Sequence, residues 1–174
     1  MAILMNVMMI AKSARRWPLW LVVCGLMLAA TTVARAENCP WLNAATAEGI
    51  LGGSVTMSVT HPSATAVSCD FSRNGSGAVA SLRIDVTTPV DAIASFAKAA
   101  AQCGAAPRKL TGVGNEAVGC TLPESTSMTE QTVGRVRERI FVLRWTHLSN
   151  ASLSAEARLD AIQGVAEAVA GSMF

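Results

Sequence analysis

The chain has 174 residues, of which 51% are hydrophobic and 15% charged, with a formal net charge of +2. Four of its fourteen lysines and arginines lie in the first 36 residues, which hold no acid. The remainder therefore sets ten basic residues against twelve acidic ones, a net charge of −2. This mildly acidic remainder lacks the broad basic surface that nucleic-acid binding needs, and we expect no nucleic-acid partner.

The first 36 residues have the pattern of an export signal. Three basic residues precede an apolar run at 17–33, and Ala34-Arg35-Ala36 forms a small-residue cleavage box. We therefore predict a signal peptide at 1–36 and a single secreted domain at 37–174, in the periplasm or outside the cell. The alternative is a retained membrane anchor, because the run reaches the lower length limit of a spanning helix, about 17 residues. After cleavage we expect no stable membrane span.

Four cysteines remain after cleavage: Cys39, Cys69, Cys103 and Cys120. An even number in an oxidising compartment predicts two disulfides. Of the three possible pairings we favour the sequential one, which closes two loops of moderate length. The spacing argues against a zinc site, since there is no Cys-x-x-Cys pair and the two histidines are isolated. We expect no metal and no cofactor.

One helix and three strands are predicted in the first half of the domain. Asn43 is suited to cap a helix at 44–51, and Gly52-Gly53 offers a left-handed end. Apolar and polar residues then alternate with period two, which predicts strands at 54–60, around 67–71 and at 80–87.

The second half repeats this order. Thr88 as N-cap, Pro89 at the first helical position and Asp91 predict the start of a helix that ends at Cys103-Gly104. Its predicted apolar face is Val90, Ile93, Ala97 and Ala100, with Phe96 beside it. Strands are predicted at 116–122 and as a hairpin within 132–146 that turns at 137–139. Ser154 caps a last helix at 155–170, whose apolar face is Leu159, Ile162, Ala166, Val169 and Met173.

This order of elements predicts an α+β fold. Two αβββ-type units form an antiparallel sheet with helices packed on one face, and a C-terminal helix follows.

The densest charge cluster is basic and consists of Arg135, Arg137, Arg139 and Arg144. Because guanidinium groups bind carboxylates and phosphates through two parallel hydrogen bonds, these residues form a possible patch for an anionic partner. The alternative is an ordinary solvated strand face, with Glu130 and Glu138 nearby.

No catalytic residue is assigned. His61 and His147 are the two histidines and could in principle act as general bases, yet no nucleophile motif accompanies them. Gly112-Val113-Gly114 lacks the Lys-Ser/Thr ending of a phosphate loop and predicts a tight turn. The two tryptophans of the domain, Trp41 and Trp145, are interpreted as core residues.

Several short motifs resemble a group of small exported bacterial domains of unknown function. They are Cys39-Pro-Trp-Leu-Asn, residues 47–53, Cys69-Asp-Phe, residues 110–117 and residues 136–142. Many members of that group are actinobacterial lipoproteins. The resemblance implies a Cys39–Cys69 disulfide and an α+β fold of paired units, similar to the extracellular sensor domain of a mycobacterial receptor kinase. This chain departs from the group in two ways: the mature terminus has no lipid-attachment cysteine, and the usual aspartate of the glycine turn is Asn115. The first departure favours a periplasmic protein without a lipid tether.

From these observations we expect an exported, non-enzymatic binding or sensor-like module, whose ligand lies in a groove between the two αβββ-type units. Its partner would be an unknown protein or small molecule of the cell envelope. The alternative is a periplasmic inhibitor or immunity protein that acts on a secreted hydrolase.

Overall fold

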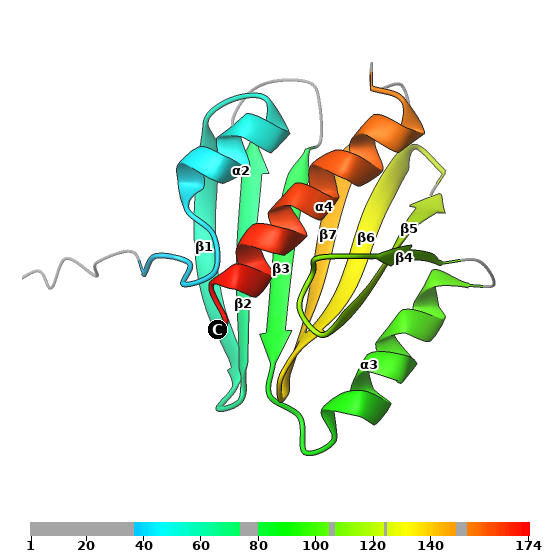
Figure 1. The fold of residues 1–174 in the computed structure, drawn as a ribbon. Helices are drawn as coiled ribbons and strands as arrows, with labels where there is room; N and C mark the ends of the chain where they lie inside the picture. Colours follow the sequence, from blue (N-terminus) through cyan, green and yellow to red (C-terminus); the bar gives the residue numbers. More distant parts are fainter. Residues whose placement is uncertain (1–36, 74–79, 105–106, 124, 149–152) are drawn as a thin grey trace, which may run out of the picture. The chain divides into compact units, whose positions relative to one another are not determined.

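The computed structural model describes residues 37–73, 80–104, 107–123, 125–148 and 153–174, so the predicted signal peptide lies outside the described residues. Three α-helices, one short 3-10 helix and seven strands are found in them (Figure 1). In chain order they are α2 (Ala44–Leu51), β1 (Val55–Ser63), β2 (Ala66–Arg73), β3 (Ser81–Thr87), α3 (Ala92–Ala100), η1 (Ala101–Cys103), β4 (Arg108–Leu110), β5 (Glu116–Pro123), β6 (Ser127–Val136), β7 (Arg139–Leu148) and α4 (Ala155–Gly171).

All seven strands form one antiparallel sheet in the order β1-β2-β3-β7-β6-β5-β4. The predicted α+β class is confirmed. The last strands of the two units, β3 and β7, pair at the centre of the sheet, and the predicted hairpin turn lies between Val136 and Arg139. The second unit has one strand more than predicted, the three-residue β4, which is too short to show a period-two pattern.

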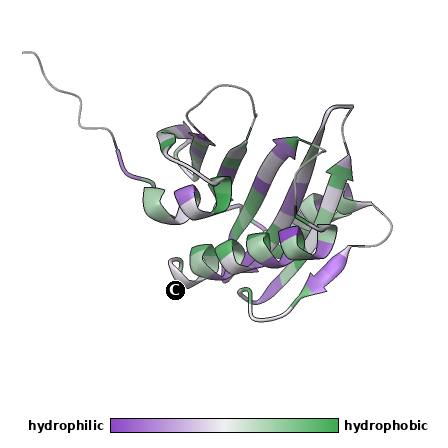
Figure 2. Cartoon of the chain, turned by 90° about the horizontal axis from the view of Figure 1, so that it is seen from above, coloured by the Kyte–Doolittle hydropathy of each residue, from purple (hydrophilic) through white to green (hydrophobic). Residues whose placement is uncertain are grey.

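The main core lies between the sheet and the helices α2 and α4. Phe71, Leu82, Ile84, Phe141 and Leu143 are fully buried on this face. Ile162, Val165, Ala166 and Val169 of α4 complete the core. In Figure 2 polar and apolar residues alternate along the strands, as expected where the two faces of a sheet have different surroundings.

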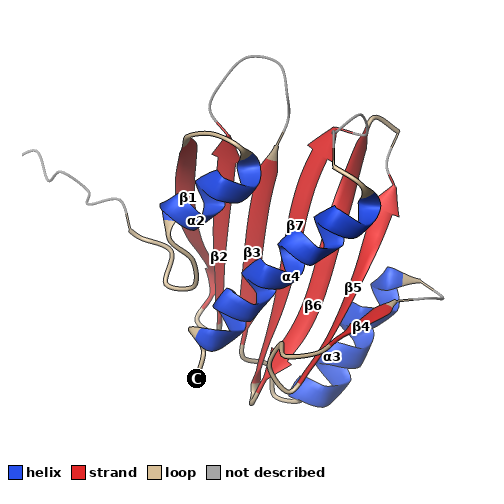
Figure 3. Cartoon of the chain, turned by 45° about the horizontal axis from the view of Figure 1, so that its top comes forward, coloured by secondary structure: helices blue, strands red, loops and turns tan. Residues whose placement is uncertain are grey.

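Helix α3 departs from the predicted arrangement, because it lies on the opposite face of the sheet from α2 and α4 (Figure 3). Neighbouring residues of β6 show this directly: Glu130 contacts α4 through Arg158, whereas Gln131 donates to Cys103 in η1. Phe96 and Ala92 are buried here, outside the main core. Among the described helices, α2 and α4 share one face of the sheet and α3 lies on the other. The helices are therefore not all on one face, although the sequence predicts that they are.

The apolar face of α3 also differs from the prediction by one residue. Asp91, not Thr88, caps the helix, since its Oδ1 accepts from the amide of Ala94 at 2.9 Å. Ala92 and Phe96 are buried, whereas Ile93 is 67% exposed. One residue is about 100° of helix rotation, which moves the expected face out to solvent.

The other two helices begin where the sequence predicted. The side chain of Asn43 accepts from the amide of Thr46, and α2 ends at Gly52 with φ 72°. Ser154 caps α4 through the amide of Ala157. On α4, however, Arg158 is buried beside the apolar face, and the predicted Leu159 is only partly buried.

Candidate functional site

The four arginines of the predicted patch separate into two pairs in the structure. Arg135 forms an ion pair with Glu116 at 2.5 Å, and Arg144 forms one with Asp85 at 2.9 Å. In the described part of the chain no carboxylate pairs with Arg137 or Arg139. Both lie exposed at the β6–β7 turn. The predicted patch is therefore reduced to these two residues as free cations.

Each of these two guanidinium groups lies over an aromatic ring from a distant part of the chain. Arg137 Cζ is 5.4 Å from the centroid of the Phe174 ring, and Arg139 Cζ is 5.8 Å from that of Trp41. Cation–π contacts hold the charge in place without neutralising it. Both arginines thus remain available to an anion.

The backbone of the β6–β7 turn is held in an uncommon conformation. Arg137 has φ 55°, the left-handed region, and it is the one non-glycine residue there among those described. Its amide donates to Asn115 Oδ1 at 2.6 Å, and the Asn115 amide donates to the Arg135 carbonyl at 2.8 Å. Glycine or asparagine adopts this region at lower cost, so Arg137 carries local backbone strain in this turn.

Gly114 lies directly against the backbone of the β6–β7 hairpin. Gly114 has φ 59°, and a Cβ built on it would lie 2.5 Å from the Arg135 carbonyl oxygen. The Gly112-Val113-Gly114 segment, where the sequence predicts a tight turn, is a bend between β4 and β5 that packs against the β6–β7 hairpin.

A pocket of about 260 Å³ lies at this turn, and we call it the turn pocket. Val136 and Met173 form a buried apolar part of its lining. Charges come from the two free arginines and from Glu138, so the lining carries one positive charge more than negative. The complete lining is Thr88, Val136, Arg137, Glu138, Arg139 and Met173.

The turn pocket also brings the two units together. Thr88 directly follows β3 of the first unit, whereas Val136 and Arg139 end β6 and begin β7 of the second unit. Met173 comes from the segment after α4.

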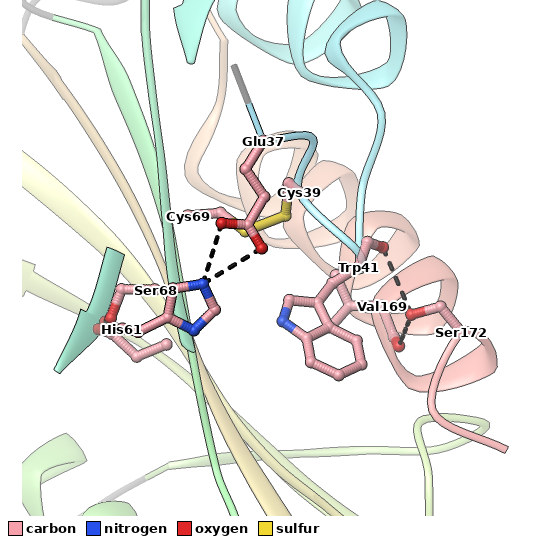
Figure 4. The surroundings of a disulfide bond; sticks show 9 residues. Glu37, Cys39, Trp41, His61, Ser68, Cys69, Val169 and Ser172 are labelled. Atoms are coloured by element: carbon pink, nitrogen blue, oxygen red, sulfur yellow. Dashed lines mark hydrogen bonds and ion pairs between the residues drawn. A yellow bond between two sulfur atoms is a disulfide. The ribbon is translucent and has the colours of Figure 1, made fainter. Parts of the chain in front are cut away.

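A second pocket, of about 370 Å³, lies where the N-terminal segment meets the end of α4, and we call it the Trp41 pocket. Figure 4 shows Trp41 beside Val169 and Ser172, and the Ser172 hydroxyl donates to the Trp41 carbonyl at 3.4 Å. The lining of the Trp41 pocket is Cys39, Pro40, Trp41, Leu42, Asn43, Thr46 and Ala168. The contact between Trp41 and Arg139 connects the two pockets. Trp41 is thus only partly a core residue, while Trp145 is buried as expected.

Both predicted disulfides are present in the structure. Cys39 pairs with Cys69 of β2, and Cys103 pairs with Cys120 of β5, which is the favoured sequential pairing. The first bond ties the segment that carries Trp41 to the sheet (Figure 4). Two disulfides suggest an oxidising location outside the cytoplasm.

The sheet face opposite α2 and α4 carries a charge network that the sequence did not reveal. Arg83 pairs with Asp70 at 3.2 Å and with Asp85 at 2.9 Å, and Asp85 also binds Arg144. Burial opposes the charge on Arg83, yet the attraction of Asp85 and Asp70 outweighs it and raises the pKa of Arg83. Because every member has an opposite charge beside it, the network offers no free charge to a ligand.

Each histidine lies near a carboxylate, in different surroundings. His61 Nε2 is 3.1 Å from Glu37 Oε2 in an exposed pair. His147 is buried, with Nε2 3.6 Å from Glu130 Oε1 and without a hydrogen-bond partner at that atom. Glu130 is already bound by Arg158 at 2.9 Å and by the hydroxyl of Thr121 at 2.5 Å. No pocket described here reaches either histidine, so neither is placed to meet a substrate.

Two general findings hold for the described residues. They contain no group of three or more His, Cys, Asp or Glu residues close enough to hold a metal ion. None of their helices has the length and apolar character needed to cross a membrane.

Comparison with protein-family models, with curated proteins and with solved structures found no match to this chain.

Proposed function

We propose that this protein is an exported, non-enzymatic binding module that holds a small anionic ligand in the turn pocket. The observation that carries the proposal is Arg137, an arginine kept in left-handed backbone with its guanidinium group unpaired at the pocket wall. Arg139 supplies a second free cation beside it. A periplasmic or secreted location agrees with the two disulfides, and a sensor-like role agrees with the resemblance noted in the sequence.

The chemistry of the lining limits the ligand. Two guanidinium groups suit a carboxylate or phosphate, which each can bind through two hydrogen bonds. Glu138 offers an acceptor for a donor group on the same ligand, and Val136 and Met173 offer apolar contact. A volume of about 260 Å³ lies just below the usual range for drug-sized ligands, roughly 300–1,000 Å³. The ligand is therefore a small molecule or one end of a larger one.

The position of the pocket favours a sensor or scavenger. A ligand there would touch Thr88 of the first unit, the turn of the second unit, and Met173 after α4. Because one small ligand then contacts three parts of the fold, its binding would stabilise the folded domain.

Titration followed by NMR or thermal shift tests this proposal, with inorganic phosphate, acetate, glutamate and chloride as probes. We expect phosphate, acetate or glutamate to shift resonances of residues 136–139 and to raise the melting temperature, with chloride as the control for ionic strength. Losing one charged hydrogen bond costs about 1.5 kcal/mol or more, so Arg137→Gln and Arg139→Gln should each weaken binding at least about tenfold.

Arg108→Gln is the matched control, because Arg108 is a surface arginine paired with Asp160, away from the turn pocket. It should leave the affinity unchanged. The proposal would be overturned if Arg137→Gln and Arg139→Gln bound the anion as tightly as Arg108→Gln. It would also be overturned if none of phosphate, acetate and glutamate gave a response. Capture of a secreted hydrolase that depends on the turn residues, without anion binding, would instead support the inhibitor alternative.

A further inference from the structure

The two edges of the sheet are built very differently. Edge strand β4 has three residues, and two of them, Arg108 and Lys109, are exposed charges. Edge strand β1 has nine residues and contains no Asp, Glu, Lys or Arg. Among the described strands β1 pairs with β2 alone. Proteins usually protect sheet edges by short strands, charges, prolines and bulges. Strand β4 is therefore protected, whereas in β1 Pro62 and the irregularity between Thr60 and Ser63 protect the C-terminal end and leave residues 54–60 open to another strand.

The apolar side chains of β1 are not fully covered by the rest of the domain. Val55, Met57 and Val59 face the main core but stay only partly buried at its margin. Ser58 and Thr60 are exposed on the other face. A further strand beside β1 would cover the apolar row, and such cross-strand contacts are worth roughly 0.2–1 kcal/mol per pair.

We propose that β1 pairs antiparallel with β1 of a second copy of this chain, forming a two-fold symmetric dimer with one continuous sheet. A second copy fits this edge because β1 is complementary to itself. Residues 54–60 include no Asp, Glu, Lys, Arg or His that would repel the same residues of a second copy, and their apolar row is symmetric about Met57. An isologous contact of this kind closes on itself at two copies.

The limits of β1 define the register of this pairing. Regular pairing with β2 breaks between Thr60 and Ser63, where Pro62 lacks an amide hydrogen, and Gly53 precedes the strand at its other end. Residues 54–60 are therefore available, and Met57 is their centre. In this register Met57 opposes Met57 of the second copy and Val55 opposes its Val59, so the apolar rows align. A slip of one residue would set apolar against polar side chains.

Cysteine cross-linking tests the register. Opposed residues have Cβ atoms about 4.5–5.5 Å apart, close to the distance that a disulfide bridges. We therefore expect Met57→Cys to form a covalent dimer under brief mild oxidation, read on a non-reducing gel. Ser58→Cys is the control: it is more exposed, but in this register it lies diagonal to its own copy, about 7–8 Å away. Cross-linking of Ser58→Cys as fast as Met57→Cys would overturn the register.

Sedimentation equilibrium tests the dimer itself. The unsubstituted protein should show a concentration-dependent mass that rises to twice that of the monomer. Met57→Lys opposes two charges at the two-fold axis and should raise the dissociation constant at least tenfold, whereas Ser58→Lys should have a smaller effect. If Met57→Lys does not fold, Val59→Lys places a charge in the same apolar row and takes its place. A monomeric mass at every concentration up to about 1 mM would overturn the proposal. This holds even if a strand of another protein were then found to pair with β1.

Discussion

The buried ion pair between α4 and the sheet gives the sharpest test of how the fold is held together. Glu130 is fully buried in β6, and its Oε1 lies 2.9 Å from Arg158 Nε in α4. Arg158 is 7% exposed and also donates to the Leu153 carbonyl. Two opposite charges are thus shielded from water and from salt, with His147 and Thr121 as their neighbours.

Removing one partner should be far more costly than removing both. Glu130→Gln keeps the shape of the side chain but leaves the Arg158 guanidinium buried without an anion, and breaking such a pair costs about 3–5 kcal/mol. Arg158→Met leaves Glu130 without its cation and should cost a similar amount. The double variant Glu130→Leu/Arg158→Leu leaves no uncompensated charge and should be more stable than either single variant.

Urea unfolding followed by tryptophan fluorescence, with the disulfides intact, measures these free energies in a double-mutant cycle. We predict a coupling free energy of about 2 kcal/mol or more between the two positions. Single losses below about 1 kcal/mol, or a double loss equal to the sum of two large single losses, would refute the assignment of Glu130 and Arg158 as a buried, mutually dependent pair.

Two further predictions concern the stability of the folded domain. Gly114→Ala should lower the free energy of unfolding by about 1–3 kcal/mol, because its Cβ would meet the Arg135 carbonyl, whereas Gly49→Ala in α2 has open space and should raise it by about 0.5–1 kcal/mol. Equal effects in thermal unfolding would contradict this. Replacing both cysteines of one disulfide by serine should cost about 3.5 kcal/mol for Cys39–Cys69 and about 3 kcal/mol for the shorter loop, from chain entropy over 30 and 17 residues. Denaturant midpoints in the reverse order would argue against this entropic ranking.

The sequence predicts those elements whose signals are local. Asn43 and Ser154 identified two helix starts, because an N-cap acts on amides three residues away. Period-two patterns located six of the strands, and the cysteine count with loop length favoured the observed disulfides. The same local reasoning placed the apolar face of α3 one residue out of phase. Ile93 and Ala97 form an apolar stripe as regular as that of Ala92 and Phe96, and only packing against the sheet shows which stripe is buried.

The candidate site depends on contacts that no local pattern contains. The sequence singled out four clustered arginines, and only the sheet register shows that Arg135 and Arg144 are already paired. The rings under Arg137 and Arg139 come from Phe174 and Trp41, which lie at opposite ends of the described chain. Similarly, the buried pair of Glu130 and Arg158 joins residues 28 positions apart.

Substitution of Arg137 by glycine most directly tests the claim that Arg137 binds an anion in the turn pocket. It removes the guanidinium group while changing the free energy of unfolding little. Relief of the left-handed strain, about 1–2 kcal/mol, is offset by the larger unfolded-state entropy of glycine, about 0.5–1 kcal/mol, and by the lost contact with the Phe174 ring, about 0.5–1 kcal/mol. The free energy of unfolding should therefore change by less than about 1 kcal/mol, while affinity for the anion falls at least about tenfold. A variant that binds the anion as tightly as the unsubstituted protein would contradict the account.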